Sequence, residues 1–285
     1  MRYSITLSYD GSSFSGWQIQ PNAPSVQEAL ESALSLALRE KVTVTGAGRT
    51  DAGVNACGYV AHFDAADDID TAALGCKLNA ILPVFVRIHE VKIAEPEFHA
   101  RFDARYRRYN YFIHRSKDPF VRHYSYLYTF PLDVDAMNEA CKLLLGTHDF
   151  SCFEKTGGNS KTSICTVFEA SWQPYEPTHV RIMGYPRGGC SGQPVLPTEA
   201  GPLPFREPMP ACPDSRPLGD DYLVFTIAAD RFLRNMVRAV VGTLLDIGRG
   251  RYEPSHMAEV LASQDRCAAG ESVPGHALFL SSVKY

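Results

Sequence analysis

The chain has 285 residues, 45% hydrophobic and 21% charged, so it can bury a core as one large domain or two modest ones. Its net charge of −4, taken alone, argues against a nucleic-acid-binding protein, whose simplest signature is a strongly basic domain. No window approaches about 18 consecutive apolar residues, and the N-terminus MRYSITLSYDG lacks a secretory pattern, so we expect no membrane span and no secretion. Eight scattered cysteines without a Cys-x-x-Cys pair predict reduced thiols in a cytoplasmic protein rather than a zinc site.

The first 105 residues predict a strand, a helix, two strands, a helix and a strand. Apolar and polar residues alternate over 2–9, which predicts a half-buried strand ending at Asp10-Gly11. Ser25 followed by Glu28 is a capping-box pattern that begins a helix, and Asp70 is the predicted cap of a second helix ending before Pro83. The remaining strands are predicted over 42–45, 57–63 and 84–93.

The second half repeats this order loosely. A helix is predicted over 135–145, with Gly146 as the residue that follows its C-terminus. A long apolar helix face begins at Phe232, and a short helix begins at Pro254. Strands are predicted over 106–114, around 162–172, over 222–229 and over 277–285. Because strands and helices mix without strict alternation, the sequence predicts an α+β fold with mostly antiparallel pairing.

One segment interrupts this pattern. Residues 184–219 hold 9 of the 19 prolines and 6 of the 21 glycines, a density that sustains neither a helix nor a central strand. The segment lies between two predicted strands, so we interpret it as an elongated hairpin loop or insertion. It is either a surface loop without a role or an arm that touches the substrate or a partner subunit.

The densest motif is GAGRTDAG, residues 46–53. One interpretation is a phosphate-binding turn of a dinucleotide-dependent oxidoreductase, with Asp67 or Asp68 at about the expected distance. That fold needs a helix directly after the glycines. Here Gly53, Gly58 and the strand-like YVAHF argue against a helix, and the glycine spacing differs.

The second interpretation makes the turn a holder for Asp51. Flanking glycines let the backbone take left-handed geometry and let a substrate approach closely. Arg49, two residues earlier, can pair with the carboxylate and keep it ionised, and an oriented carboxylate is a credible nucleophile. From spacing alone, a purely structural Arg–Asp turn pair is the alternative.

The motif GAGRTDAGV resembles the signature loop of the tRNA pseudouridine synthase A family. The family usually has His where this chain has Asn55, and FDAR replaces the more usual FSAT at 102–105, but neither departure removes a position needed for chemistry. Further blocks match in family order and cover nearly the whole chain outside 184–219: YDG with Phe14 and GWQ, FHARF with RRY, FLRNMVR with VG, and LFL to VKY.

The resemblance implies a pseudouridine synthase fold: two similar α/β subdomains joined through a mostly antiparallel sheet, with the active-site cleft between them. We expect an N-terminal subdomain over 1–105, which carries the nucleophile loop, and a C-terminal subdomain over 106–285. It also implies an isomerase that converts uridine to pseudouridine in the tRNA anticodon stem-loop, around positions 38 to 40. The resemblance implies a cytoplasmic homodimer, and it implies neither a cofactor nor a metal.

The resemblance assigns Asp51 as the nucleophile and Tyr109 as the tyrosine that stacks on the target base and is a candidate proton-transfer group. A base detached from its ribose has to stay flat while it turns, which an aromatic face allows. Arg49 orients Asp51 or fills the gap left by the flipped base. A catalytically inactive RNA-binding protein on the same fold is the remaining alternative, although the nucleophile loop is intact.

Charge is distributed unevenly along the chain. Residues 99–123 carry seven Lys or Arg and two Asp, and residues 231–251 carry five Arg and one Asp, so the rest of the chain is strongly acidic. We therefore expect basic strips around Asp51 and a tRNA affinity that falls steeply with salt. The members predicted to contact phosphates are Arg101, Arg105, Arg107, Arg108, Arg231, Arg234 and Arg238. The overall charge no longer argues against an RNA partner.

Overall fold

The computed structural model describes residues 1–66, 68–155, 157, 162–183 and 221–285. The predictions for the segment 184–219 lie outside these residues. Within them, no helix combines the length and the apolar character needed to cross a membrane.

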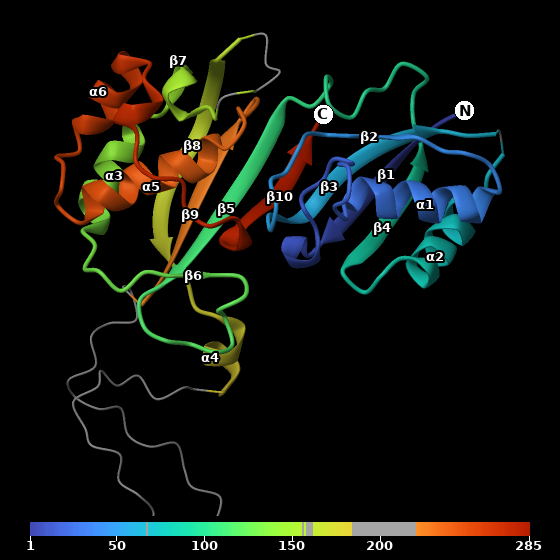
Figure 1. Ribbon diagram of the computed structural model, residues 1–285, viewed down its shortest axis with the longest axis horizontal. Helices are drawn as coiled ribbons and strands as arrows, with labels where there is room; N and C mark the ends of the chain where they lie inside the picture. Colours follow the sequence, from blue (N-terminus) through green and yellow to red (C-terminus); the bar gives the residue numbers. More distant parts are fainter. Residues whose placement is uncertain (67, 156, 158–161, 184–220) are drawn as a thin grey trace, which may run out of the picture.

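A mixed sheet extends through both halves of the molecule (Figure 1). Its order is β4-β1-β3-β10-β5-β9-β8-β7, with β2 paired to β3 and β6 paired to β5. The pairs β3–β10 and β5–β6 are parallel and the others are antiparallel, which confirms the predicted α+β class. The strands are β1 (Arg2–Tyr9), β2 (Val44–Gly46), β3 (Asn55–Asp64), β4 (Val86–Ile93), β5 (Tyr106–His114), β6 (Tyr126–Leu127), β7 (Gly146–Asp149), β8 (Ile164–Pro174), β9 (Tyr222–Ala229) and β10 (Leu278–Lys284).

The first half confirms the predicted order of elements. Burial alternates along β1, and its residues Tyr3, Ile5 and Leu7 are fully buried. The Ser25 hydroxyl accepts a hydrogen bond from the Glu28 amide at 3.2 Å and caps α1 (Val26–Leu38). Asp70 caps α2 (Thr71–Ile81) in the same way.

The second half differs from the prediction at several places: β6, β7 and the helix Thr178–Met183 were not predicted, the helix predicted to begin at Phe232 begins at Met236, and one helix ends early. The predicted helix over 135–145 is α3 (Val134–Lys142), and Gly146 begins β7 instead of following the helix directly. The cause is a tight last turn, in which the amides of Leu143, Leu144 and Leu145 bond to carbonyls three residues earlier. The other helices are α4 (Thr178–Met183), α5 (Met236–Gly248) and α6 (His256–Ser263), and the short 3-10 turns are η1 (Gly11–Ser13), η2 (Ser151–Phe153), η4 (Arg266–Ala268) and η5 (Gly275–Ala277).

The strand β10 joins the two halves. It lies between β3, which belongs to the first half, and β5, which opens the second (Figure 1). The described buried residues accordingly form a hydrophobic cluster that continues across this junction. The division into 1–105 and 106–285 stays a prediction: its boundary falls just before β5, but the chain returns to the first half through β10.

Candidate active site

The Asp51 loop, defined here as Ala47–Val54, connects β2 to β3. Strand β3 begins at Asn55, directly after the loop, so no helix faces the glycines and the dinucleotide-site interpretation is wrong. Gly53 has a φ of +76°, a left-handed conformation that favours glycine. Gly46 and Gly48 do not have positive φ, so the predicted left-handed geometry does not apply to them.

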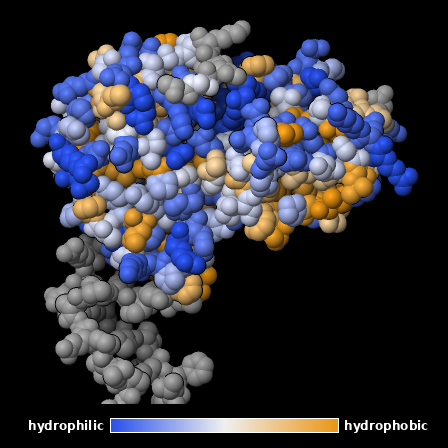
Figure 2. Space-filling view, in the orientation of Figure 1, coloured by the Kyte–Doolittle hydropathy of each residue, from blue (hydrophilic) through white to orange (hydrophobic). Residues whose placement is uncertain are grey.

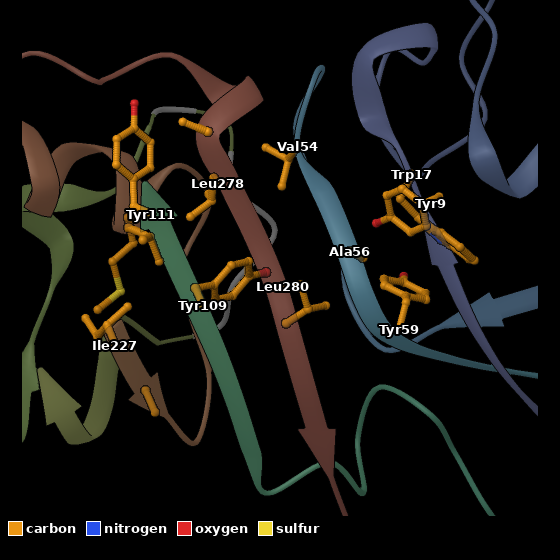
Figure 3. Close-up of a cluster of buried hydrophobic side chains, with 14 of the residues drawn as sticks. Tyr9, Trp17, Val54, Ala56, Tyr59, Tyr109, Tyr111, Ile227, Leu278 and Leu280 are labelled. Carbon is orange, nitrogen blue, oxygen red and sulfur yellow. The ribbon is translucent and has the colours of Figure 1, made fainter. Parts of the chain in front are cut away.

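Three aromatic residues support the Asp51 loop. Figure 3 shows Tyr9, Trp17 and Tyr59 gathered beside β3, and the rings of Trp17 and Tyr59 stack at 4.1 Å. The Tyr9 hydroxyl bonds to the Thr50 hydroxyl at 2.8 Å, and the Trp17 amide donates to the Thr50 carbonyl at 3.2 Å. The Tyr59 hydroxyl donates to the Gly48 carbonyl. This cluster fixes the backbone on both sides of Arg49.

Two glycines of the motif serve different purposes. A Cβ at Gly46 would lie 2.1 Å from the Tyr59 hydroxyl oxygen and 2.6 Å from the Trp17 ring, so the aromatic cluster leaves no room for a side chain. A Cβ at Gly48 would have no heavy atom outside its chain neighbours within 4 Å. Packing therefore requires glycine at 46, whereas position 48 leaves open space beside the loop.

Asn55 fastens the loop to two distant segments. Its side chain is buried, accepts a hydrogen bond from the Gly11 amide at 2.8 Å and donates one to the His276 carbonyl at 2.7 Å. A Cβ at Gly275 would lie only 2.6 Å from the Ala52 carbonyl oxygen, so the segment containing η5 packs directly against the loop. The residue noted as a departure from the family pattern therefore has a structural role of its own.

Asp51 pairs with Arg238 of α5. Arg238 Nη1 lies 3.2 Å from Asp51 Oδ2, and the two side chains are 22% and 31% exposed. Arg238 Nε also donates to the Val273 carbonyl at 2.6 Å, which fixes the guanidinium. Arg49, the predicted partner of Asp51, is exposed, and no described residue forms an ion pair with it. The carboxylate is therefore oriented by a residue 187 positions away.

Arg107 has a similar internal role. Its guanidinium donates to the carbonyls of Ala47, Arg101, Ala104 and Asp230, at 2.6 to 3.1 Å, and so ties the start of the Asp51 loop to β5. Arg107 and Arg238 thus bond within the protein, and their contacts with phosphates stay a prediction. Arg108 pairs with Glu169, whereas the exposed members of the set are Arg101, Arg105 and Arg234.

Tyr109 lies on β5, beside β10. Only 9% of it is exposed, and its ring packs edge-on against Phe232 at 5.1 Å. In Figure 3 its hydroxyl points across β10, near Leu280. Burial raises the pKa of Tyr109 to about 12; the positive charge of Arg107 lowers it and the negative charge of Asp51 raises it. Tyr109 is therefore neutral at physiological pH and within electrostatic reach of Asp51.

Residues 140–285 match the sequence model of a family described as tRNA pseudouridine synthase. A tRNA pseudouridine synthase A of Bacteroides thetaiotaomicron is 44% identical over 285 residues, all of this chain and 90% of the relative. The chain belongs to this family. The proteins of the same name from Parabacteroides distasonis and Bacillus subtilis are 43% and 36% identical, over all of this chain and 96% and 99% of their own lengths.

The blocks that resemble this synthase family meet at the Asp51 loop. The first block supplies Tyr9 and Trp17 beneath it, the middle block supplies Arg107 at its start, and the FLRNMVR block supplies Arg238 to Asp51. Arg238 lies within the matching FLRNMVR block, but its pairing with Asp51 was not predictable, because nothing local indicates a contact so far along the chain. Among the described residues, no three His, Cys, Asp or Glu side chains are grouped to hold a metal ion.

Proposed function

We propose that this chain isomerises uridine to pseudouridine in tRNA, with Asp51 as the nucleophile. The observation that carries the proposal is the orientation and accessibility of the Asp51 carboxylate. This carboxylate sits on a loop fixed at both ends, it is oriented by the partly buried guanidinium of Arg238, and about a third of its side chain stays accessible. An oriented, reachable carboxylate is what covalent catalysis by aspartate requires.

The reaction breaks the N-glycosidic bond of the uridine and forms a C–C bond between the same ribose and the rotated uracil, so no atom enters or leaves. Tyr109, neutral and packed against Phe232, offers an aromatic surface and a proton-bearing hydroxyl to the base. Arg49 is exposed on the same loop as Asp51, which suits a side chain that enters the space vacated by a flipped base.

We place the target uridines in the anticodon stem-loop, around positions 38 to 40. The test is to map pseudouridine in tRNA from cells that lack this chain and from cells that express it. Loss confined to these positions, restored by expression, is the expected result. If modification at these positions is unchanged and pseudouridine is lost elsewhere in tRNA, the proposed target positions are wrong.

We also propose that the chain acts as a cytoplasmic homodimer, with tRNA contacting both subunits. Support for association comes from the surface: Val84 is 92% and Phe85 is 40% exposed, in the loop between α2 and β4. Figure 2 shows hydrophobic residues gathered on the face over this loop. Exposed patches of this kind mark contact surfaces more often than single exposed apolar residues do.

Asp51→Asn tests the nucleophile. The amide keeps the size of the side chain and an oxygen for Arg238, but it cannot attack, so we expect pseudouridine formation to fall by about 10³-fold or more while tRNA binding is largely kept. The matched control is Asp64→Asn at a 62%-exposed carboxylate paired with Arg2. Substantial turnover by Asp51→Asn would exclude the assignment. A wild-type chain that binds tRNA without turnover would favour the inactive RNA-binding alternative.

Tyr109→Phe separates the two roles of the tyrosine. The ring and its contact with Phe232 remain, whereas the hydroxyl is lost. We expect tRNA affinity to be retained and single-turnover pseudouridine formation to fall by about tenfold or more, since positioned proton transfer contributes about 10²–10⁴-fold. An unchanged rate would remove the proton-transfer role and leave stacking alone.

A further inference from the structure

A cavity of about 550 Å³ lies beside the Asp51 loop, outside the catalytic residues described so far. It is open to solvent and bordered by the end of β5, the β5–β6 loop with β6, and η5, near the lower end of β5 in Figure 1. Pro119, Tyr126 and Leu127 give it apolar walls. Its volume falls within the roughly 300–1,000 Å³ typical of sites for small organic ligands.

Polar groups are built into the interior of the cavity. His114 and Ser125 are each 2% exposed, and His114 Nδ1 lies 3.0 Å from the Ser125 hydroxyl. His276 reaches the same residue, with Nε2 3.3 Å from the Ser125 carbonyl oxygen. Burial lowers the pKa of His114, so its imidazole is neutral at physiological pH. The interior thus offers imidazole edges that can donate or accept hydrogen bonds.

The rim of the cavity is positively charged. Lys117 and Arg122 line it, both are exposed, and no described carboxylate pairs with either. The acidic lining residue, Asp118, is already engaged by the Tyr222 hydroxyl at 2.7 Å and by His179 Nε2 at 2.9 Å. The charge left available to a ligand is therefore positive.

The cavity and the Asp51 loop share a wall. His276 lines the cavity with its side chain, while its carbonyl accepts a hydrogen bond from Asn55 at 2.7 Å. Tyr124 of the β5–β6 loop also donates to Asp10 Oδ2 at 2.9 Å. The segment containing η5 therefore connects the cavity with the Asp51 loop.

We propose that this cavity binds a nucleotide of the substrate RNA next to the target uridine. The base or ribose enters between the apolar walls and meets the imidazole edges, and the phosphate lies between Lys117 and Arg122. Unstacked bases held against aromatic and apolar side chains are the usual mode of RNA recognition in loops, and cations at the rim supply the phosphate contact. The proposal rests on the proposed function, since it takes tRNA as the ligand.

The test measures tRNA binding by fluorescence anisotropy in the Asp51→Asn background, so that binding is read without turnover. The double variant Lys117→Ala/Arg122→Ala is expected to bind about tenfold or more weakly, with a salt slope lower by about 1. Leu127→Trp, which fills the cavity from a 37%-exposed position, is expected to weaken binding without changing the rim charge. In the active enzyme, both variants should raise KM and leave kcat unchanged.

A control with the same loss of charge is Lys41→Ala/Lys142→Ala, at exposed positions away from the cavity. If the rim and control variants weaken binding equally, or if neither rim nor filling variant does, the cavity does not bind RNA. Uridine 5′-monophosphate and adenosine 5′-monophosphate provide a second arm. If they bind tightly to the cavity while the rim variant keeps full tRNA affinity, the ligand is a free nucleotide and the proposal is overturned. If every form lacks activity but the differences in tRNA affinity remain, the result contradicts the proposed reaction and leaves the proposed binding site supported.

Discussion

Single residues decide how Asp51 is presented. The aspartate and its glycine-rich loop could be identified from sequence because the motif is local, and a nearby arginine was a reasonable partner. The structure instead pairs Asp51 with Arg238, through a contact that spans 187 positions and depends on where α5 packs. Local spacing carries no information about such a contact, so the carboxylate was predictable and its orienting group was not.

Gly46 and Gly48 form a matched pair for testing what the loop glycines do. Gly46→Ala should lower the free energy of unfolding by about 1–3 kcal/mol, because its Cβ would overlap Trp17 and Tyr59. Gly48→Ala should change stability by no more than about 0.5 kcal/mol, since its Cβ meets open space. If the substrate approaches there, Gly48→Ala should still lower kcat/KM about tenfold or more, equivalent to ~1.4 kcal/mol.

Chemical denaturation and steady-state kinetics on both variants check this pair. Equal destabilisation of the two would contradict the packing argument for Gly46. A Gly48→Ala enzyme with wild-type kcat/KM would show that the open space beside the loop is not used by the substrate.

At the scale of elements, periodicity and capping predicted most helices and strands. The exceptions have local causes: β6 is two residues long, β7 follows a tight turn, and α4 is a short helix of six residues. The order of strands was beyond local reasoning, because parallel pairing of β10 with β3 joins segments more than 200 residues apart. Long-range pairing depends on the packing of whole faces, which one sequence does not display.

Asparagine side chains stabilise elements by bonding to the backbone of a neighbour, and Asn55 does so beside the site. Asn55→Ala removes partners from the buried Gly11 amide and from the His276 carbonyl. An unsatisfied buried group costs about 1–3 kcal/mol, so we expect a loss of that size in the free energy of unfolding. We also expect a lower kcat, since the Asp51 loop loses an anchor.

Asn138→Ala is the matched control, since Asn138 likewise accepts from the Trp172 amide at 2.8 Å and donates to its carbonyl at 3.1 Å, far from Asp51. It should destabilise the protein while leaving kcat at the wild-type value. Two variants with equal losses of stability and equal kcat would show that Asn55 does nothing specific for the site.

At the scale of the whole molecule, several tyrosine and cysteine side chains, whose phenol and thiol groups can ionise, are buried. Burial is the main cause that raises the pKa of Tyr9, Tyr59, Tyr109 and Tyr111, to about 12 for Tyr109. In the unfolded chain the tyrosine phenol ionises near pH ~10, whereas in the folded state these phenols ionise only at higher pH. The stability this difference contributes is complete below pH ~10 and is lost as the pH rises to about 12.

We therefore expect the free energy of unfolding to decline above pH ~10, by about 1.4 kcal/mol per pH unit for each such tyrosine. Guanidinium unfolding between pH ~8 and pH ~11 measures the decline. Tyr109→Phe should make its slope shallower by about 1.4 kcal/mol per pH unit, the contribution of one tyrosine. A flat profile across that range would mean that these phenols are reached by solvent in the folded state.

The position of β10 has a consequence for synthesis. It leaves the ribosome after the nine other described strands, yet it occupies the middle of the sheet, and the residues just before it pack against the Asp51 loop and Arg238. Domains fold largely as units during translation, the N-terminal part first. During synthesis the edge of β3 stays uncovered until β10 emerges, and Asn55 reaches its partner His276 only after the segment just before β10 has been made. We therefore expect a chain truncated before β10 to lack activity on tRNA, which a comparison with the 285-residue chain measures.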